Sequence, residues 1–474
     1  MAVHTDMHPP LAGAEPDETP ATPSGAPELS HELRTEIRRV APFDFPLLAA
    51  VILLMGLGAV MVYSATINEM TQLQGNGSQK LETHLVHMGI GVAVMLVATF
   101  VPYLRLRPLT YPALMVTLLL LAMVIVIGVE AGNARRWLAL PGFNFQPAEL
   151  AKVVFILFLA HSITKKAGNI RRFMVAFIPH FMVCAMLILL CLFQPDFGTS
   201  VLLVVIMFTM LFIAGTKLSY VALFLFVGGF LAFQAVASND MRLGRVLATI
   251  DPWAHRDDRG HQMVASQIAI GSGEVTGQGL GFGGQTLTGN LPEGETDFVL
   301  SVLAEQLGAM GVVFVAICIG IILVRGMRIA LRTEEPFGRV LAFGLTLLLV
   351  LEGVVNMLVA VALIPTKGLT LPFVSYGGSS MLVSCAAIGI LLNISRALDW
   401  NRARQFMPVI DEINDANDAS DAEGQGAPVR QIRRQVETSG WSRFSQRWLK
   451  RAPKQSVDDV ISAQLPGARK EDGQ

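Results

Sequence analysis

Three carboxylates stand at two-residue spacing directly before a long apolar run. Glu293, Glu295 and Asp297 lie in the segment LPEGETDFVLSVLAEQLGAMG, residues 291–311. Asp297 begins the apolar run, so it could be an ordinary carboxylate at a helix start. Glu293 and Glu295 already supply negative charge there, and a third carboxylate raises the pKa of at least one group by mutual repulsion. Because a raised pKa at a low-dielectric surface suits a general base, Asp297 is the strongest catalytic candidate.

Positive groups that could bind an anion occur in two further segments. The segment GNARRWL places Arg135 and Arg136 beside an apolar run, where they could bind a ligand or anchor a helix end. The segment FQPAELAK brings Glu149 and Lys152, three residues apart, onto one face of a predicted helix. These two residues could cancel each other as a structural pair or take part in catalysis.

Other acidic residues also lie at or inside apolar runs, where an ionisable group is costly. Asp196 in FQPDFGT stands between two runs, and a cap on the next helix is its expected role. Glu305 and Glu352 lie inside predicted spans. Asn356, one turn after Glu352, is expected to satisfy that carboxylate, which favours a structural role for Glu352.

The composition of the chain indicates that these groups belong to a membrane protein. The chain has 474 residues, of which 52% are hydrophobic and 15% charged, and its mean hydropathy is +0.52. These values indicate a polytopic membrane protein. The net charge of −1 gives no basic field that would indicate nucleic acid as a partner. The cysteines lie inside apolar runs without metal-ligand spacing, which predicts neither disulfides nor a zinc site: Cys184, Cys191, Cys318 and Cys385.

We therefore predict an all-α polytopic membrane protein with ten transmembrane helices. Runs of about 17 to 25 apolar residues are the signature of spanning helices. Such runs cover residues 44–64, 84–103, 109–128, 147–163, 173–193, 199–215, 218–238, 298–324, 338–361 and 372–395.

The distribution of positive charge predicts the orientation of these helices, because short cytoplasmic loops are enriched in Lys and Arg. With both termini cytoplasmic, the inner loops hold eleven such residues: Arg105, Arg107, Lys165, Lys166, Arg171, Arg172, Lys217, Arg325, Arg328, Arg332 and Arg339. The short outer loops then hold four: Lys80, Arg135, Arg136 and Lys367. This imbalance supports cytoplasmic termini.

The segments between and beyond the helices are of three kinds. Residues 239–297 form a large extracytoplasmic loop between helices 7 and 8, and its apolar, glycine-rich composition favours a folded loop. A phosphate-binding loop is disfavoured, because no strand precedes the glycines and no GK[ST] follows them. Residues 1–40 are predicted to be a disordered cytoplasmic tail. Residues 397–474 form a second cytoplasmic tail, whose basic, tryptophan-containing part could lie on anionic lipid or bind a partner.

Four segments together resemble the SEDS family of bacterial shape, elongation, division and sporulation proteins. They occur in the family's order between about residues 44 and 396: RRWLALPGFNFQPAELAK, FQPDFGTSVLL, GETDFVLSVLAEQLGAMGV and IPTKGLTLPFVSYGGSSML. The segment DPWAHRDDRGHQMVASQIAIGSGEVTGQGLG and the Ser379–Ser380 pair are more similar to the division members than to the elongation members.

The resemblance implies a peptidoglycan glycosyltransferase that polymerises lipid II into β-1,4 glycan strands. It would act at the outer face of the bacterial cytoplasmic membrane, at the division septum. The implied partners are lipid II, a class B penicillin-binding protein transpeptidase, other division proteins and membrane lipids. The family's essential aspartate falls on Asp297. The predicted substrate-binding residues are Arg135, Arg136, Glu149, Lys152, Lys367 and Ser379.

Glycosyl transfer from a lipid diphosphate needs a base for the acceptor hydroxyl and positive charge for the leaving group, which these residues could supply. No metal ligand and no certain cofactor is predicted, but a divalent cation at the diphosphate remains open. The chain departs from the family where Gly294 and Glu295 replace a common Ala-His, and where Gln306 replaces a common Glu. A lipid II flippase, an elongation-type polymerase and a scaffold for division partners are the alternatives.

Overall fold

The computed structural model describes residues 44–72, 77–131, 134–140, 143–169, 172–238, 240–258, 260–366 and 368–405. The chain divides into two units, and the unit Pro42–Arg402 contains the elements discussed below, apart from the last three residues of α15. The predicted N-terminal tail and the C-terminal tail beyond residue 405 lie outside the described residues, as does Lys367.

Each predicted span overlaps a long helix. The helices are α2 (Phe45–Gln72), α3 (Gly77–Phe100), α4 (Leu106–Ile127), α5 (Pro147–Lys165), α7 (Ile178–Phe193), α8 (Phe197–Ile213), α9 (Leu218–Ala237), α13 (Val299–Arg332), α14 (Pro336–Ala360) and α15 (Gly378–Gln405). Within the described part, seven are long and apolar enough to cross a membrane, whereas α7, α8 and α9 contribute shorter apolar stretches. The helical membrane fold is confirmed, and the count of ten spans stays a prediction.

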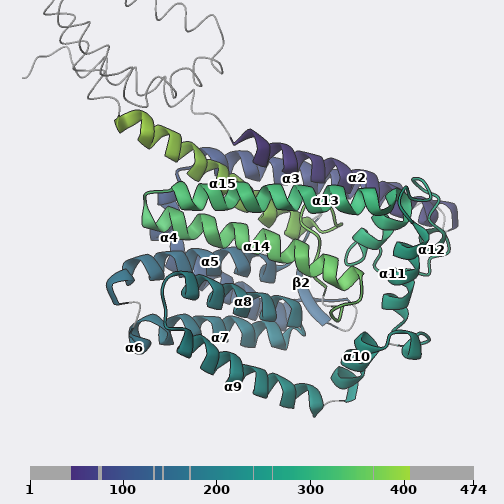
Figure 1. Cartoon of the computed structure of the whole chain (residues 1–474), viewed down its shortest axis with the longest axis horizontal. Coiled ribbons are helices and arrows are strands. Elements are labelled where there is room, and N and C mark those ends of the chain that lie inside the picture. The colour runs from purple at the N-terminus through teal and green to yellow at the C-terminus, as the bar shows by residue number, and fades with distance from the viewer. Residues whose placement is uncertain are drawn as a thin grey trace, which may run out of the picture. The chain divides into compact units, whose positions relative to one another are not determined.

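The predicted large loop is folded, as its composition indicated. It contains α10 (Asp240–Ile250), the 3-10 helix η3 (Trp253–His255), α11 (His261–Ser272) and α12 (Gly284–Leu287). Three short elements connect other helices: η1 (Tyr103–Arg105), η2 (Ala167–Asn169) and α6 (Phe173–Ala176). Figure 1 shows α10, α11 and α12 gathered toward one end of the long helices, together with strand β2.

A small sheet, which the sequence analysis did not predict, precedes α5. It consists of β1 (Val129–Ala131), β2 (Ala134–Leu140) and β3 (Phe143–Phe145), antiparallel in the order β1-β2-β3. Two of its strands have only three residues, too few to give a recognisable alternating pattern. The all-α class is confirmed, and this sheet is a small addition to it.

Helix α5 lies in the interior of the helical unit and packs against α4, α14 and α8. Most of its length is buried, including Glu149 and Lys152. A helix that faces protein on all sides can carry ionisable groups at membrane depth, because these groups meet other side chains instead of lipid. The interior position of α5 therefore explains why charges interrupt its apolar run.

Helix α13 is broken near its start at Gly308, whose backbone angles are φ 67° and ψ −166°. The break frees main-chain groups that lipid could not satisfy, and the glycine-rich loop after α11 satisfies them. The hydrogen bonds run from Gln278 N to Glu305 O (2.9 Å), from Gly279 N to Gln306 O (3.0 Å), from Ala309 N to Glu274 O (3.0 Å) and from Met310 N to Val275 O (3.3 Å).

This contact also explains the glycines of the loop. A β-carbon on Gly273 would collide with Ala304 O, and one on Gly277 would collide with Gln306 O. Gly277 also has a φ of 81°, in the region that favours glycine. Backbone-to-backbone packing against α13 therefore accounts for the glycine-rich composition without a phosphate ligand.

Candidate active site

The segment that carries Asp297 forms a compact turn before α13. Thr296 N and Phe298 N both donate to Glu293 O, at 3.2 and 3.1 Å. Glu293 itself has a φ of 55°, an uncommon conformation for a residue with a side chain. Phe298 is buried in the core and anchors the end of the turn. The turn thus holds Asp297 two residues before the first residue of α13.

Three successive carbonyl groups of this turn accept hydrogen bonds from other parts of the chain. Tyr376 N donates to Glu295 O (2.8 Å), Ser375 Oγ to Thr296 O (2.6 Å) and Asn356 Nδ2 to Asp297 O (2.9 Å). The donors come from the end of α14 and from the segment that precedes α15. This segment was predicted to begin the last span at residue 372, but α15 begins only at Gly378.

The pKa of Asp297 is raised to about 6. Burial of the carboxyl group is the main cause, and the charge of Glu293 adds to it. The main-chain N–H of Gly368 and the charge of Arg136 act in the opposite direction. The predicted rise is therefore present, but its expected cause is corrected, because desolvation exceeds repulsion and Glu295 is engaged elsewhere.

Glu295 forms an ion pair with Lys80 of α3, at 3.0 Å between Nζ and Oε1. The two side chains are partly exposed, so the pair contributes little to stability, about 0–1 kcal/mol. Its effect on the site is to draw the negative charge of Glu295 toward α3 and away from Asp297.

Strand β2 directs the two arginines of GNARRWL differently, because neighbouring residues on a strand point to opposite faces. Arg136 donates through Nε to Gln194 O (3.2 Å) and through Nη2 to Pro195 O (2.7 Å). Arg135 is exposed and pairs with Glu130 across the β1–β2 hairpin at 3.5 Å. The structure thus brings Arg136 to Asp297 and leaves Arg135 outside the site.

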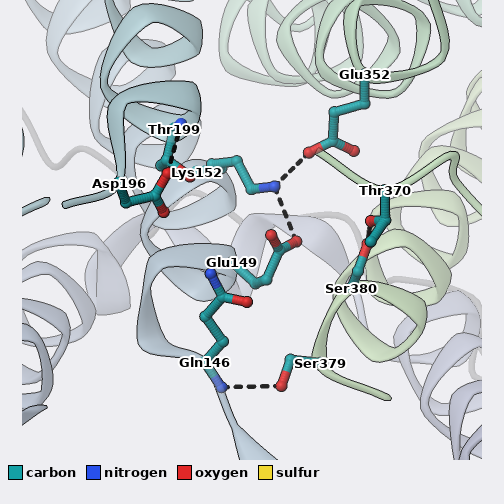
Figure 2. Close-up of polar contacts among 9 residues, drawn as sticks. All are labelled: Gln146, Glu149, Lys152, Asp196, Thr199, Glu352, Thr370, Ser379 and Ser380. Atoms are coloured by element: carbon teal, nitrogen blue, oxygen red, sulfur yellow. Dashed lines mark hydrogen bonds and ion pairs between the residues drawn. The ribbon is translucent and has the colours of Figure 1, made fainter. Parts of the chain in front are cut away.

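Lys152 lies between two carboxylates, as Figure 2 shows. Its ammonium group pairs with Glu149 Oε2 at 2.8 Å and with Glu352 Oε1 of α14. Glu149 and Lys152 share one helix face as predicted, and they form the ion pair that was one of the two alternatives. The expected contact of Asn356 with Glu352 is wrong, because Lys152 reaches Glu352 from α5 and Asn356 turns to main-chain carbonyls.

The remaining predicted residues connect segments. Asp196 caps α8 by accepting from Thr199 N at 3.0 Å, which confirms the expected cap. Ser379 accepts from Gln146 N (2.9 Å) and donates to Asn144 O (3.1 Å), so it joins the start of α15 to the start of α5. Figure 2 shows the contact between Gln146 and Ser379 on the Glu149 side of the polar cluster.

Glu305 of α13 binds the large loop. Its buried carboxylate accepts from Gln285 N (2.6 Å), Thr286 N (3.3 Å) and Thr286 Oγ1 (2.7 Å), which fixes the start of α12 against α13. The sequence marked Glu305 only as a charge inside a span. Two of its three hydrogen-bond donors are main-chain N–H groups of a distant loop, so residue type and spacing could not have identified them.

No group of three or more His, Cys, Asp or Glu side chains that could hold a metal ion occurs among the residues described. The groups that act on the Asp297 carboxyl are instead the main-chain N–H of Gly368 and the charges of Arg136 and Glu293. This arrangement can accept a proton at Asp297 and place positive charge beside it.

These features define a multi-pass helical membrane protein with a half-buried carboxylate directly before a long apolar helix. Residues 45–399 match the family model FTSW_RODA_SPOVE, described as cell cycle protein, and the chain belongs to this family.

Among its relatives is a probable peptidoglycan glycosyltransferase FtsW of Geobacter sulfurreducens, 40% identical over 368 residues, which are 77% of this chain and 98% of the relative. The corresponding protein of Pseudomonas fluorescens is 36% identical over 356 residues, 74% of this chain and 87% of the relative.

The chain is also similar to solved structures. A chain from a peptidoglycan synthase complex that coordinates polymerization and crosslinking aligns with a TM-score of 0.64 and 30% identity. The alignment covers 75% of this chain and 98% of that chain. The rod shape determining protein RodA of Thermus thermophilus aligns with a TM-score of 0.55 and 29% identity, over 75% of this chain and 97% of RodA.

Proposed function

We propose that this protein is a peptidoglycan glycosyltransferase that polymerises lipid II into β-1,4 glycan strands. The observation that carries the proposal is Asp297, a carboxylate whose pKa is raised to about 6 and which stands beside Arg136 at the start of a spanning helix. The glycosyltransferase names of relatives aligned over 98% of their length support the reaction class.

In the proposed reaction, Asp297 acts as the general base. Its carboxylate takes the proton of the acceptor sugar hydroxyl while the hydroxyl oxygen attacks the anomeric carbon of the donor. The new glycosidic C–O bond forms as the C–O bond to the donor's diphosphate breaks, and the diphosphate leaves with the bonding electrons. The lipid tails of donor and acceptor stay in the bilayer, so a base at the end of a spanning helix lies at a suitable depth.

Arg136 is the cation best placed to balance the leaving diphosphate. It donates to two main-chain carbonyls, and no carboxylate within the described ranges forms an ion pair with it. Lys152 is already shared by two carboxylates, so its charge is balanced before substrate arrives. We therefore assign diphosphate binding to Arg136. Lys152 instead joins α5 to α14. A divalent cation bound to the diphosphate would add to the positive charge of Arg136. Measuring activity in the presence of a chelator tests this contribution.

The proposed setting is the outer face of the bacterial cytoplasmic membrane at the division septum. A class B penicillin-binding protein and other division proteins are the proposed partners, supported by the similarity to a chain of a peptidoglycan synthase complex. The loop of residues 239–297 would lie outside and both termini inside. Cysteine substitutions in that loop should react with an impermeant maleimide added to intact spheroplasts, and protection of all of them would contradict this orientation.

The direct test of the function is glycan synthesis by the purified protein. The protein is reconstituted in detergent or liposomes with its transpeptidase partner, and lipid II is supplied on the accessible face. We expect long strands that lysozyme degrades. Strand synthesis absent from the wild-type complex, together with transfer of fluorescent lipid II between leaflets, would instead identify a transporter.

A further inference from the structure

Asn356 connects the two segments that meet at Asp297. Its side chain is 1% exposed, and its Nδ2 group donates to Asp297 O and to Leu369 O, each at 2.9 Å. Leu369 directly follows Gly368, whose N–H binds the Asp297 carboxylate. One amide therefore holds both the main chain of the proposed base and the segment that supplies that base with a hydrogen bond.

The acceptor end of the same amide has no corresponding partner. Asn356 Oδ1 is buried and makes no hydrogen bond to any group that the structure describes. A buried polar atom without a partner costs stability. Its two donated hydrogen bonds account for an asparagine here, because an apolar side chain would leave both carbonyl groups without this donor.

Asn356 also stands in a fixed relation to the polar cluster of α5. Glu352, which accepts from Lys152, lies four residues earlier on α14 and therefore on the same helix face. Helix α14 thus presents Glu352 to α5 and, one turn later, Asn356 to the Asp297 turn. The spacing of these two side chains along one rigid helix sets the separation between α5 and the proposed base.

We infer that Asn356 is a positioning residue of the glycosyl transfer, which holds Asp297 and the Gly368–Leu369 segment in register with α5 through its two donated hydrogen bonds. The inference rests on the proposed function, because it assigns Asn356 a role in that same reaction. Ser375 assists from the other side, donating to Thr296 O (2.6 Å) and accepting from Leu371 N (2.9 Å).

The test compares Asn356→Leu with Asn393→Leu in the full-length protein with its partner. Asn393 is a matched control, because it is also buried and binds main-chain groups far from Asp297. It donates to Thr99 O (2.7 Å) and accepts from Tyr103 N (2.8 Å). For each variant the thermal unfolding midpoint, kcat and KM for lipid II, and the pH dependence of kcat are measured per folded molecule.

We expect Asn356→Leu to lower kcat by about 10- to 100-fold, since small displacements of a reacting group have effects of this size. Its KM should change by less than a few-fold. The acid limb of the kcat profile should move to lower pH, because a freed Asp297 becomes more hydrated and burial is the main cause of its raised pKa. Glu293 and Arg136, which also set this pKa, are unchanged in the variant. The Gly368 N–H, which lowers the pKa, is loosened together with its segment, but burial is the larger contribution, so the net shift is to lower pH.

Asn393→Leu should unfold at a lower temperature but keep the kcat and the pH profile of the wild type. Equal kcat and identical acid limbs in both variants, with the wild type active, would overturn the inference and leave the proposed function intact. An inactive wild type would contradict the proposed function itself. If Asn356→Leu does not fold, Asn356→Ser is tested in its place. The serine hydroxyl can donate to one of the two carbonyl groups, so we expect a smaller loss of kcat with a pH shift in the same direction. The kcat and pH dependence of the wild type in this variant would overturn the inference.

Discussion

Asp297 and Arg136 face the same glycine. A β-carbon placed on Gly368 would lie 3.8 Å from Asp297 Oδ2 and 3.8 Å from Arg136 Nη1. Gly368 has a φ of 63°, which lets its N–H donate to the Asp297 carboxylate while its missing side chain leaves space beside both charged groups. The proposed base and the proposed diphosphate-binding cation therefore meet at one residue.

This relationship predicts the effect of Gly368→Ala. The methyl group would occupy the space between the two charged groups, and the positive φ would add strain of about 1 kcal/mol. We expect kcat/KM to fall by at least about ten-fold, the equivalent of 1.4 kcal/mol. Gly215→Ala is the matched control, since Gly215 also has a positive φ (91°) but meets no atom within 4 Å of an added β-carbon. A similar loss of activity in both variants would show that strain alone is responsible.

The causes of the raised pKa of Asp297 predict opposite shifts for two substitutions. A general base works when deprotonated, so the rate should rise with pH through about 6 in the wild type. Arg136→Gln removes a charge that lowers this pKa, and the acid limb should move to higher pH. Glu293→Gln removes a charge that raises it, and the limb should move to lower pH. Shifts in one common direction, measured from kcat/KM profiles, would contradict the assignment of Asp297 as the base.

The buried position of Lys152 predicts a large effect on stability. Lys152→Met would leave Glu149 and Glu352 buried without a counter-charge, which typically costs about 3–5 kcal/mol. Arg328→Gln, at an exposed position of α13, should change stability by less than about 0.5 kcal/mol. Chemical denaturation followed by tryptophan fluorescence compares the two variants. Should Lys152→Met keep wild-type stability yet lose activity, Lys152 would act on the substrate instead of joining the helices.

The break in α13 predicts a contrast between two glycines of the same helix. A β-carbon on Gly308 would collide with Val275 O and Gly277 N, and the φ of 67° adds strain. Gly308→Ala should therefore lower stability by about 2 kcal/mol or more. Gly320→Ala meets no atom within 4 Å and should leave stability unchanged or slightly higher, because alanine favours helix. Equal unfolding midpoints would mean that the loop does not hold the break in place.

The sequence predicted the helical membrane fold well, because apolar run length is a local property that the hydrophobic interior of the membrane enforces. It also marked Asp297, Glu149 and Lys152 as candidate site residues, since a charge inside or beside an apolar run is conspicuous; their roles stay predictions. The small sheet before α5 was missed because hydrogen bonds between very short strands leave no periodic signal.

The partners of the site residues were harder to predict. Lys152 meets Glu352 across 200 positions of sequence, and Asn356 meets Asp297 across 59, so spacing carries no information about either contact. Local reasoning therefore paired Asn356 with Glu352, its neighbour on the same helix. The same limit applies to Glu295. Its ion pair with Lys80 depends on how α3 packs, which the sequence does not show.

The central claim is that Asp297 accepts the proton of the acceptor hydroxyl, and Asp297→Asn tests it most directly. The amide keeps the shape of the side chain and can still accept from the Gly368 N–H, so folding and partner binding should be preserved. It cannot take up the proton, and positioned bases contribute about 10²–10⁴-fold to rate.

The decisive measurement is glycan strand synthesis from lipid II supplied at the outer face, by the wild-type complex and by the Asp297→Asn complex at equal folded concentration. The account predicts strands from the wild type and a rate at least about 100-fold lower from the variant across the pH range. Strand synthesis by Asp297→Asn at a rate near that of the wild type would contradict it.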